Sequence, residues 1–528
     1  MRSCSSAQTQ RRSRRVLLFL FVRLFALIVG MPSSWADDAV PAPQAAARPN
    51  ILFIFSDDHA TAAISAYGSK LIDTPHIDRL AREGTLFRNC FCTNSICGPS
   101  RAAILTGKHS HINGFRDNHS TFDGGQVTFP KLLQQAGYQT AIVGKWHLVS
   151  QPTGFDHWEV LPGQGAYYNP VLLSAPTVPA GPPSKRTVPG YVTDIVTDLA
   201  IDWIDTQRDR SKPFMLMLQH KAPHREWEPG PEEIDLFRGT TFPEPETLFD
   251  DYAGRAGGAA EQEMTIARHM LPKDLALITP KNMTPEQKAR WEAAYTTENE
   301  AFRKANLTGD ALTRWNYQRY IANYLRCVAG VDRTIGRVLE YLDKTGLARN
   351  TIVVYSSDQG FFLGEHGWFD KRWMYEESLR MPLVIRWPGF AVPGTVDDNL
   401  VQNLDFAPTF LAAAGVAAAS DMQGRSLVPL LRGDSPADWR QSVYYHYYEF
   451  PEPHRVPSHY GVRTRTHKLI WYDDRREWEL FDLTKDPREL RSIHGDPTAR
   501  ELFADLRTEL ARVRTEAGDD TGKPLPAP

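Results

Sequence analysis

The sequence predicts an α/β protein in which helices flank a mixed sheet, followed by a smaller C-terminal antiparallel sheet that carries one helix. Three observations support this fold class: short buried runs that end in polar residues, one long amphipathic stretch, and alternating segments confined to the C-terminal part. The chain has 528 residues. At roughly 150 residues per domain this allows three to four domains, or one large unit with an appendage.

The composition is that of a globular protein. Hydrophobic residues make up 42% and charged residues 23% of the chain, which argues against disordered, fibrous and multi-span membrane classes. The formal net charge is only −3, so no global positive field draws the chain toward nucleic acid. We therefore expect charge chemistry to be local, and no nucleic-acid partner.

The first 36 residues predict an export signal. A basic cluster at residues 11–15 precedes an apolar run at 16–29, and residues 34–36 offer a small-x-small cleavage site. The mature chain would begin near Asp37 and act in the periplasm or outside the cell, without stable membrane insertion. Arg23 within the apolar run fits no export route well, and an uncleaved membrane anchor is kept as an alternative.

Four short apolar runs predict buried strands of the sheet, and each is followed by polar residues. In open α/β sheets ligands bind outside the carboxyl ends of the strands, so these polar residues should meet at one edge although they are distant in sequence. The runs are residues 51–55, 141–143, 214–218 and 352–355, and the polar clusters that follow are residues 56–58, 144–147, 219–221 and 356–359.

Two segments between these strands differ in the spacing of their apolar residues. Apolar residues from Ile321 to Leu342 recur every three or four positions, which predicts a packing helix closed by Gly346, with Cys327 as a small buried residue inside it. Residues 229–310 are polar and interrupted by Pro and Gly. We expect them to form a helical or looped excursion beside the strand-end edge, where it would shape substrate access.

The texture changes again beyond residues 433–436, and no internal repeat is evident. Short alternating segments predict a small antiparallel sheet, followed by a helix at about 497–512. This organisation gives an export signal at 1–36, a main domain at 37–436 and a C-terminal subdomain at 437–528. The alternating segments are residues 443–448, 461–464, 468–471 and 478–481.

The most specific string in the chain runs from Cys97 to Lys108, CGPSRAAILTGK. Pro99 suits a first helical turn and Gly107 can end the helix, so Cys97 would lie at a helix N-terminus with Arg101 one turn on. On these grounds alone a buried structural cysteine is an equally good interpretation. Few cysteines remain after signal removal, which excludes dependence on a disulfide framework, and Cys90 and Cys92 are interpreted as structural.

Asp57, Asp58, Asp358 and Gln359 offer hard oxygen ligands from two strand ends. Three carboxylates and an amide carbonyl, without a dense set of His or Cys, suit Ca²⁺, or Mg²⁺, better than Zn²⁺. An Asp-Asp pair after a strand is weak evidence by itself, because turns and helix caps use the same residues.

The string from Cys97 resembles the signature of type I sulfatases of the alkaline phosphatase superfamily: Cys or Ser, one variable residue, Pro, Ser or Ala, Arg, and a Leu-Thr-Gly ending. The resemblance runs from about residue 49 to 483. It implies an alkaline-phosphatase-like fold and that a maturation enzyme oxidises Cys97 to formylglycine (3-oxoalanine), whose hydrated aldehyde is the nucleophile. It also implies one divalent cation, usually calcium, held by the acidic residues and residue 97. Gln359 stands where the family often has Asn, so this ligand would be longer.

Several basic residues in the polar clusters match the family's sulfate-binding and proton-transfer positions. Cleavage of a sulfate ester builds charge on the departing alcohol, so its transition state needs a cation, fixed ammonium groups and an acid. The matching residues are Lys145, His147, Lys221, His224 and Lys371, and Arg101 would join Lys145 in holding the nucleophile.

The resemblance implies a reaction in two halves. Asp358 helps to deprotonate one hydroxyl at residue 97, which attacks sulfur while His224 or Lys371 protonates the leaving oxygen. His147 then removes the proton of the second hydroxyl, the aldehyde forms again and sulfate is expelled.

Residues 162–170, 221–227 and 459–464 resemble bacterial carbohydrate sulfatases such as N-acetylglucosamine-6-sulfatases and mucin-desulfating enzymes. This implies a 6-O-sulfated N-acetylhexosamine of glycosaminoglycan or mucin-type glycans as substrate. Sugar recognition needs carboxylates and imidazoles that bind vicinal hydroxyls. Our candidates are Asp370 and His459, with His454 as the alternative to His459.

Two alternatives keep the same sequence features. One is a phosphonate monoester hydrolase or phosphodiesterase of the same superfamily, which competition between sulfate and phosphate esters would distinguish. The other is a non-catalytic protein that binds sulfated glycan while Cys97 remains a thiol, which the mass of the peptide containing Cys97 would reveal.

Overall fold

The computed structural model describes residues 48–177, 181–451, 453–519 and 525–526. The expected export signal at residues 1–36 therefore lies outside the described residues. Within the described part of the chain, no helix is long and apolar enough to cross a bilayer.

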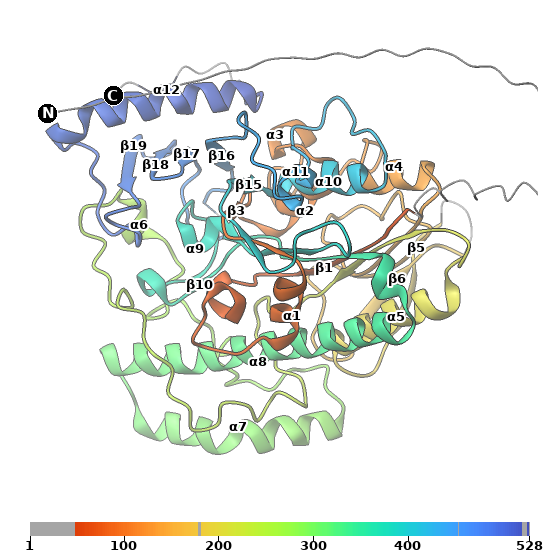
Figure 1. The fold of residues 1–528 in the computed structure, drawn as a ribbon. Helices are drawn as coiled ribbons and strands as arrows, with labels where there is room; N and C mark the ends of the chain where they lie inside the picture. The colour runs from red at the N-terminus through yellow and green to blue at the C-terminus, as the bar shows by residue number, and fades with distance from the viewer. Residues whose placement is uncertain (1–47, 178–180, 452, 520–524, 527–528) are drawn as a thin grey trace, which may run out of the picture. The chain divides into compact units, whose positions relative to one another are not determined.

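A ten-stranded sheet forms the centre of the molecule (Figure 1), with β1 paired to β8 and β9, and β8 to β4, all in parallel. These are the four strands predicted from the buried runs. Nearly all their side chains are buried, because helices cover both faces of the sheet. The strands are β1 (Asn50–Ser56), β4 (Gln139–Lys145), β8 (Phe214–Gln219) and β9 (Thr351–Ser357).

Shorter strands extend the sheet on both sides, in the order β14-β2-β13-β9-β1-β8-β4-β5-β6-β7. The sheet is mixed, since β13 runs antiparallel to β9 and β6 antiparallel to β5. The added strands are β2 (Thr85–Phe87), β5 (His157–Leu161), β6 (Val171–Ser174), β7 (Ser184–Thr187), β13 (Leu383–Arg386) and β14 (Thr395–Asp397).

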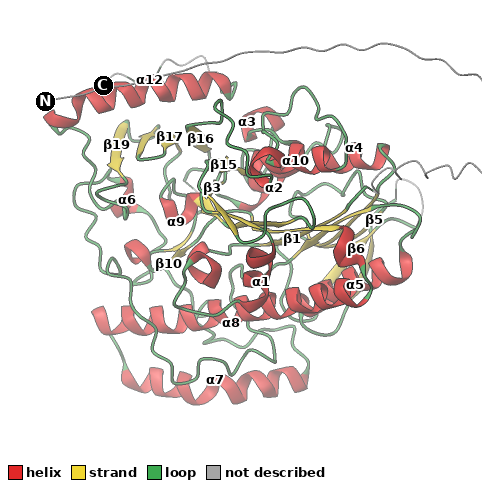
Figure 2. Cartoon of the chain, in the orientation of Figure 1, coloured by secondary structure: helices red, strands yellow, loops and turns green. Residues whose placement is uncertain are grey.

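Helices cover the two faces of the sheet (Figure 2), which confirms the predicted α/β class. The long predicted helix, α8, begins earlier than the apolar pattern suggested and ends as expected, with Gly346 in the left-handed region at φ +72°. On its side of the sheet lie α1 (Pro75–Glu83), α5 (Val192–Asp202) and α8 (Gly309–Lys344), and on the other side α2 (Cys97–Thr106), α3 (Ser110–Asn113), α4 (Phe129–Gln135), α10 (Phe406–Ala413) and α11 (Val428–Leu431).

Residues 229–310 form the predicted excursion, mostly as loops with two helices, α6 (Gly258–Glu261) and α7 (Pro285–Ala305). Thr284 and Gln287 form a capping box at the start of α7, where each side chain accepts a hydrogen bond from the other's backbone N–H.

The C-terminal part is the predicted antiparallel sheet with one helix. Its four strands pair in sequence order, and α12 packs on β16, β17 and β18 over an apolar cluster that includes Trp471 and Leu510. The elements are β16 (Ser442–Tyr447), β17 (His459–Thr464), β18 (His467–Tyr472), β19 (Glu477–Asp482) and α12 (Arg500–Glu516).

Two small sheets and one short helix complete the description. One is a three-stranded sheet whose strands are far apart in sequence, and the other is a two-stranded hairpin that carries Asp370 at its end. They consist of β3 (Cys90–Phe91), β12 (Arg380–Met381) and β15 (Val401–Gln402), then β10 (Phe362–Leu363) and β11 (Phe369–Asp370), with α9 (Glu376–Leu379) between.

Candidate active site

The carboxyl ends of the central strands bring the predicted acidic residues together. The register of β1 and β9 pairs Ser56 with Ser357, so the residues that follow lie side by side. The backbone N–H of Asp58 donates to Oδ1 of Asp358 at 3.0 Å. Carboxylate oxygens of Asp57, Asp58 and Asp358 all lie within 4.8 Å of one another, and all three side chains are buried. The strand-end geometry thus creates a compact acidic cluster.

Cys97 is the first residue of α2 and faces this cluster. Its Sγ lies 3.4 Å from Oδ1 of Asp57 and 3.4 Å from Nζ of Lys371. The residue is 1% exposed, and burial together with the charge of Asp57 raises the pKa of the thiol well above its usual range. An unmodified Cys97 would therefore be a poor nucleophile, because the thiolate is the reactive form.

Arg101, one turn further along α2, contacts residues at the ends of four strands, β1, β4, β8 and β9. Its NH2 group lies 3.2 Å from Oδ2 of Asp57 and 3.1 Å from Oδ2 of Asp358. Its NH1 group donates to the backbone oxygen of Lys145 at 3.0 Å and to Oε1 of Gln219 at 2.9 Å. The buried guanidinium fixes both the carboxylates and the backbone that carries Lys145.

Two buried lysines neutralise different carboxylates of the cluster. Nζ of Lys145 forms an ion pair with Asp57 and donates to Oε1 of Gln164 at 2.5 Å. Nζ of Lys371 lies 2.6 Å from Oδ1 of Asp58. Burial by itself favours a neutral Asp57, but the charges of Lys145 and its neighbours outweigh this effect and hold the pKa of Asp57 well below its usual range.

Asp58 and Gln359 add oxygen atoms to the acidic cluster that could serve as ligands of a cation. Burial raises the pKa of Asp58 to about 8, because the charge of Lys371 opposes it only in part. Nε2 of Gln359 donates to Oδ1 of Asp58, while its Oε1 is buried without a hydrogen-bond partner among the described residues. An orphaned carbonyl oxygen beside three carboxylates is a donor set suited to a hard divalent cation.

His224 and His147 flank the cluster as neutral imidazoles. Nε2 of His224 lies 3.8 Å from Oδ2 of Asp58 and its Nδ1 contacts the backbone oxygen of Arg225. Burial and the charge of Lys145 lower the pKa of His224 well below its usual range and that of His147 to about 2. Nδ1 of His147 is buried and has no hydrogen-bond partner in the described part of the chain. Both rings are therefore unprotonated at neutral pH.

Lys221 is less closely tied to the carboxylates. Its Nζ lies 4.7 Å from the ring centroid of Tyr167 and 3.4 Å from the backbone oxygen of Arg225. Burial, with the charge of Lys145, lowers the pKa of Lys221 to about 8. Lys221 lies beside the acidic cluster and also lines a separate cavity.

Asp370 lies directly beside the cluster, at the end of β11. Its Oδ1 accepts a hydrogen bond from the backbone N–H of Lys371 at 2.8 Å and pairs with Arg372, and its Oδ2 lies 3.3 Å from Nε2 of His454. The structure therefore brings His454 and Arg372 to this carboxylate. Burial favours a neutral Asp370, but the charges of Arg372 and Lys371 hold its pKa well below the usual range.

His459 does not reach the site, contrary to expectation. It is fully buried in β17, its Nδ1 lies 2.7 Å from the backbone oxygen of Pro457, and its Nε2 accepts the backbone N–H of Met374 at 3.1 Å. Both ring nitrogens are thus engaged by the backbone, so no polar group remains for a sugar. Of the two histidines considered from the sequence, His454 is the one placed beside Asp370.

Three residues that position the site were not predicted from the sequence. Gln164 holds Lys145, Gln219 holds Arg101, and Arg372 pairs with Asp370. Single glutamines carry no spacing signal, whereas the consecutive charges at residues 370–372 could have pointed to Arg372. Cys90, Cys92 and Cys327 are buried free thiols, in agreement with their interpretation as structural residues.

Comparisons with known proteins extend over most of the chain. The sulfatase family model matches residues 49–416, and the model described as N-sulphoglucosamine sulphohydrolase, C-terminal, matches residues 364–516. The N-acetylglucosamine-6-O-sulfatase of Bacteroides thetaiotaomicron is 51% identical over 507 residues, which cover 92% of this chain and 88% of that protein.

Solved structures share the fold. One, described as a complex with its substrate D-glucosamine-2-N,6-O-disulfate, superposes with a TM-score of 0.87 at 49% identity, covering 90% of this chain and 99% of the other. The phosphonate monoester hydrolase of Agrobacterium radiobacter has a TM-score of 0.67 at 20% identity, covering 89% and 96% of the two chains. The second likeness extends to the fold alone.

Proposed function

The chain belongs to the sulfatase family and is a sulfuric ester hydrolase; we propose that it removes the 6-O-sulfate from a terminal glucosamine whose nitrogen is acetylated or sulfated. The names of the 51% identical relative and of the substrate in the similar solved structure support this substrate. The sulfated sugar would belong to a glycosaminoglycan or mucin-type glycan.

The observation that carries the proposal is the surrounding of residue 97. Its Sγ lies 3.4 Å from both a carboxylate and an ammonium group, at the start of a helix whose second turn supplies Arg101. This arrangement suits a nucleophile that must meet an anionic ester in a buried site. We propose that a maturation enzyme converts Cys97 to formylglycine, since the buried thiol would stay protonated.

A divalent cation fits the acidic cluster, and we propose Ca²⁺ rather than Mg²⁺. Asp57, Asp58, Asp358, Gln359 and residue 97 would hold it, an irregular set of several protein ligands that Ca²⁺ tolerates better than Mg²⁺ does. When bound, the cation supplies positive charge that polarises the ester and offsets the three carboxylates.

The buried lysines bind the sulfate group. Lys145 pairs with Asp57 and Lys371 with Asp58, so both ammonium groups are already held in the cluster, where they can meet the negative charge of the ester. Arg101 keeps Asp57 and Asp358 in place and thereby orients the groups around residue 97.

Asp358 would help to deprotonate a hydroxyl of the hydrated aldehyde at residue 97, and three further residues would transfer protons. Asp58 holds the pKa of Lys371 well above its usual range although burial opposes this, so Lys371 carries a proton at neutral pH and can donate to the leaving oxygen. His224 is neutral without substrate and would gain a proton through the charge of a bound ester. His147, with its unpaired buried Nδ1, would act as the base that releases the product.

Asp370 and His454 would recognise the sugar. They contact each other beside Lys371, so one carboxylate and one imidazole face the position next to the ester. His454 lies in the connection between β16 and β17, which gives the C-terminal subdomain a part in the site. We keep residues 37–436 and 437–528 as the proposed domain division and propose that the enzyme is exported.

The test begins with coexpression of this chain and a maturation enzyme. The mass of the tryptic peptide spanning residues 89–101 should show the change from thiol to aldehyde at Cys97. The purified enzyme should release sulfate from N-acetylglucosamine 6-sulfate much faster than from its 3-sulfate or 4-sulfate isomers, and faster than it cleaves the corresponding 6-phosphate. An intact thiol in a fully active preparation, or a preference for phosphate esters, would overturn the proposal.

A further inference from the structure

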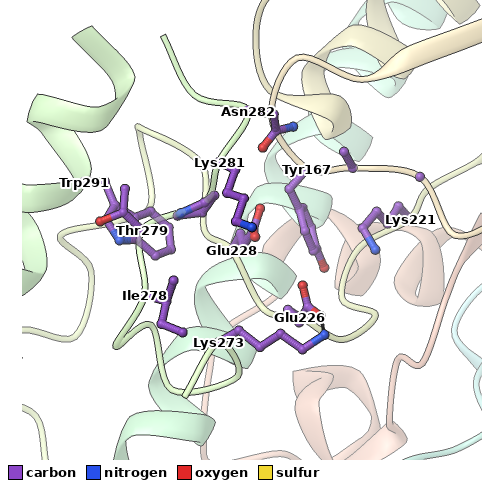
Figure 3. A pocket seen from close by; sticks show the side chains of 13 residues that line it. Tyr167, Lys221, Glu226, Glu228, Lys273, Ile278, Thr279, Lys281, Asn282 and Trp291 are labelled. Atoms are coloured by element: carbon purple, nitrogen blue, oxygen red, sulfur yellow. Dashed lines mark hydrogen bonds and ion pairs between the residues drawn. The ribbon is translucent and has the colours of Figure 1, made fainter. Parts of the chain in front are cut away.

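A cavity of about 460 Å³ adjoins the sulfate site on the side of Lys221. Its walls come from three segments: residues 165–167, the stretch from Lys221 to Glu228 after β8, and residues 273–282 with Trp291 of the excursion. Figure 3 shows Lys281 and Glu228 between Tyr167 and Trp291. Cavities of this size commonly bind small ligands.

The walls of the cavity are joined to the loop after β8 that carries His224. Arg225 follows His224 and forms two contacts with Asp274, 2.8 Å from Nε to Oδ1 and 2.6 Å from NH2 to Oδ2. The hydroxyl of Tyr167 donates to the backbone oxygen of His224 at 2.6 Å. A ligand in the cavity would therefore lie in a defined position relative to His224.

The opposite wall is held by amide contacts. Nδ2 of Asn169 donates to the backbone oxygen of Asn282 at 2.6 Å and to Oε1 of Gln287 at 2.7 Å, close to the start of α7. These bonds join the excursion to the loop that follows β5. The cavity is thus bounded on both sides by segments that are tied to the sheet.

The charged side chains of the lining divide into two kinds. Lys273 and Glu226 form an ion pair with each other. By contrast, the side chains of Glu228 and Lys281 make no hydrogen bond or ion pair with any residue that the structure describes. Burial raises the pKa of Glu228 to about 7 despite the charge of Lys221. One acceptor and one cation therefore remain available to a ligand.

We infer that this cavity is a second saccharide subsite, which binds the sugar attached to the sulfated residue and favours one that carries an anionic substituent. Glu228 accepts hydrogen bonds from hydroxyl groups of that sugar, and Lys281 contacts its carboxylate or sulfate. The apolar faces of Tyr167, Ile278 and Trp291 surround the ring. The inference rests on the proposed function, because Lys221 places the cavity next to the proposed sulfate site.

Four substrates separate the contributions. They are N-acetylglucosamine 6-sulfate alone and the same sugar joined through its C1 to glucose, to glucuronic acid and to glucose 3-sulfate. Lys281→Ala should lower kcat/KM at least about tenfold on the two acidic disaccharides and leave the neutral disaccharide and the monosaccharide unchanged. A larger loss on one acidic substrate identifies carboxylate or sulfate as the preferred group.

Glu228→Ala should lower kcat/KM on all three disaccharides but not on the monosaccharide. The matched control is Lys288→Ala, because Lys288 is an exposed lysine of α7 that pairs with Glu292 outside the cavity. It should behave as the parent enzyme on every substrate. Equal losses on all four substrates, or none on any, would overturn the subsite.

A binding measurement keeps this result separate from turnover. Calorimetric titration of the four sugars into the Cys97→Ala enzyme should show tighter binding of the acidic disaccharides, and Lys281→Ala should abolish this preference. If sulfate is not released from any 6-sulfate but the Lys281-dependent preference persists, the proposed function fails and the subsite stands. If sulfate is released and no preference appears, only the subsite fails.

Discussion

The cluster around residue 97 and the cavity beside Lys221 use charge in different ways. In the cluster, Arg101, Lys145 and Lys371 each contact a carboxylate and all are buried. In the cavity, Glu228 and Lys281 make no hydrogen bond or ion pair with described residues. Charges fixed in a buried site supply preorganised electrostatics for one chemical step, whereas unpaired charges on loops can adapt to different ligands.

The largest expected effect is at the nucleophile. Cys97→Ala should lower kcat on the order of 10⁴-fold or more, as when an enzyme loses its nucleophile, with little change in melting temperature. Cys327→Ala is the control, since this buried cysteine lies in α8 and should lower the melting temperature while sparing kcat. Measuring sulfate release and thermal unfolding on both variants tests this, and similar effects of the two would remove the distinction between cluster and scaffold.

Removal of the cation comes next. Exhaustive chelation should lower the rate by about 10³-fold, equivalent to the several kcal/mol that a bound cation can contribute. Added Ca²⁺ should restore the activity more fully than Mg²⁺ does. Sulfate release and elemental analysis of the same sample provide the measurement. Unchanged rates in a sample free of metal would contradict a cation site at Asp57, Asp58 and Asp358.

Single lysines of the cluster should have smaller effects. Lys371→Ala and Lys145→Ala should each lower kcat by about 10²- to 10³-fold, the usual cost of one fixed group that stabilises transition-state charge. Lys468→Ala is a matched control, because this buried lysine pairs with Glu376 and Glu489 away from residue 97. It should lower the free energy of unfolding by about 3–5 kcal/mol and leave kcat of the folded enzyme unchanged. A loss of stability without loss of kcat in Lys371→Ala would contradict its catalytic role.

Substitution of Asp370 or His454, the residues proposed to recognise the sugar, should lower turnover of the sulfated sugar only. Asp370→Asn and His454→Gln should each lower kcat/KM on N-acetylglucosamine 6-sulfate about tenfold and hardly change turnover of a small aryl sulfate. His459→Gln should affect both substrates alike, because His459 is bonded to the backbone. Steady-state kinetics on both substrates decides the matter. Equal losses on both in Asp370→Asn would assign Asp370 to the catalytic cluster.

The smallest expected effect is on the pH dependence of the free energy of unfolding, through His220. Burial lowers the pKa of His220 from 6.5 to about 4, so the unfolded chain binds more protons between these pH values. The free energy of unfolding should therefore decrease as pH falls through this window, by up to about 1.4 kcal/mol per pH unit from this residue. His220→Leu should make the decrease shallower in denaturant titrations from pH 7 to 4, at no cost in hydrogen bonds, because neither ring nitrogen has a described partner. An unaltered slope would show that His220 does not titrate in this way.

Regular periodicity made much of the fold predictable. The four buried runs became β1, β4, β8 and β9, and the apolar spacing from Ile321 to Leu342 became part of α8. Because ligands bind at the carboxyl ends of strands, the sequence also predicted that Asp57 and Asp358 lie close together. The start of α8 at Gly309 could not be predicted from the same spacing, because its first turns lack the continuous apolar stripe.

The choice between His454 and His459 shows where sequence reasoning ended. Both histidines occur in the C-terminal part, and alternation along a strand does not reveal which one meets a segment from elsewhere in the chain. The structure seats His459 in the buried face of β17, bonded to Met374, and leaves His454 in a loop beside Asp370.

By itself, the sequence determined the strands, the long helix and the segment from Cys97 that carries the family resemblance, because each depends on spacing within one short stretch. Only the tertiary structure decided which distant charges meet. It pairs Lys371 with Asp58 and Arg225 with Asp274, and it leaves Lys281 without a protein partner among the described residues. Such contacts depend on how loops pack against the sheet, and this packing is set by the sum of many weak interactions across the chain.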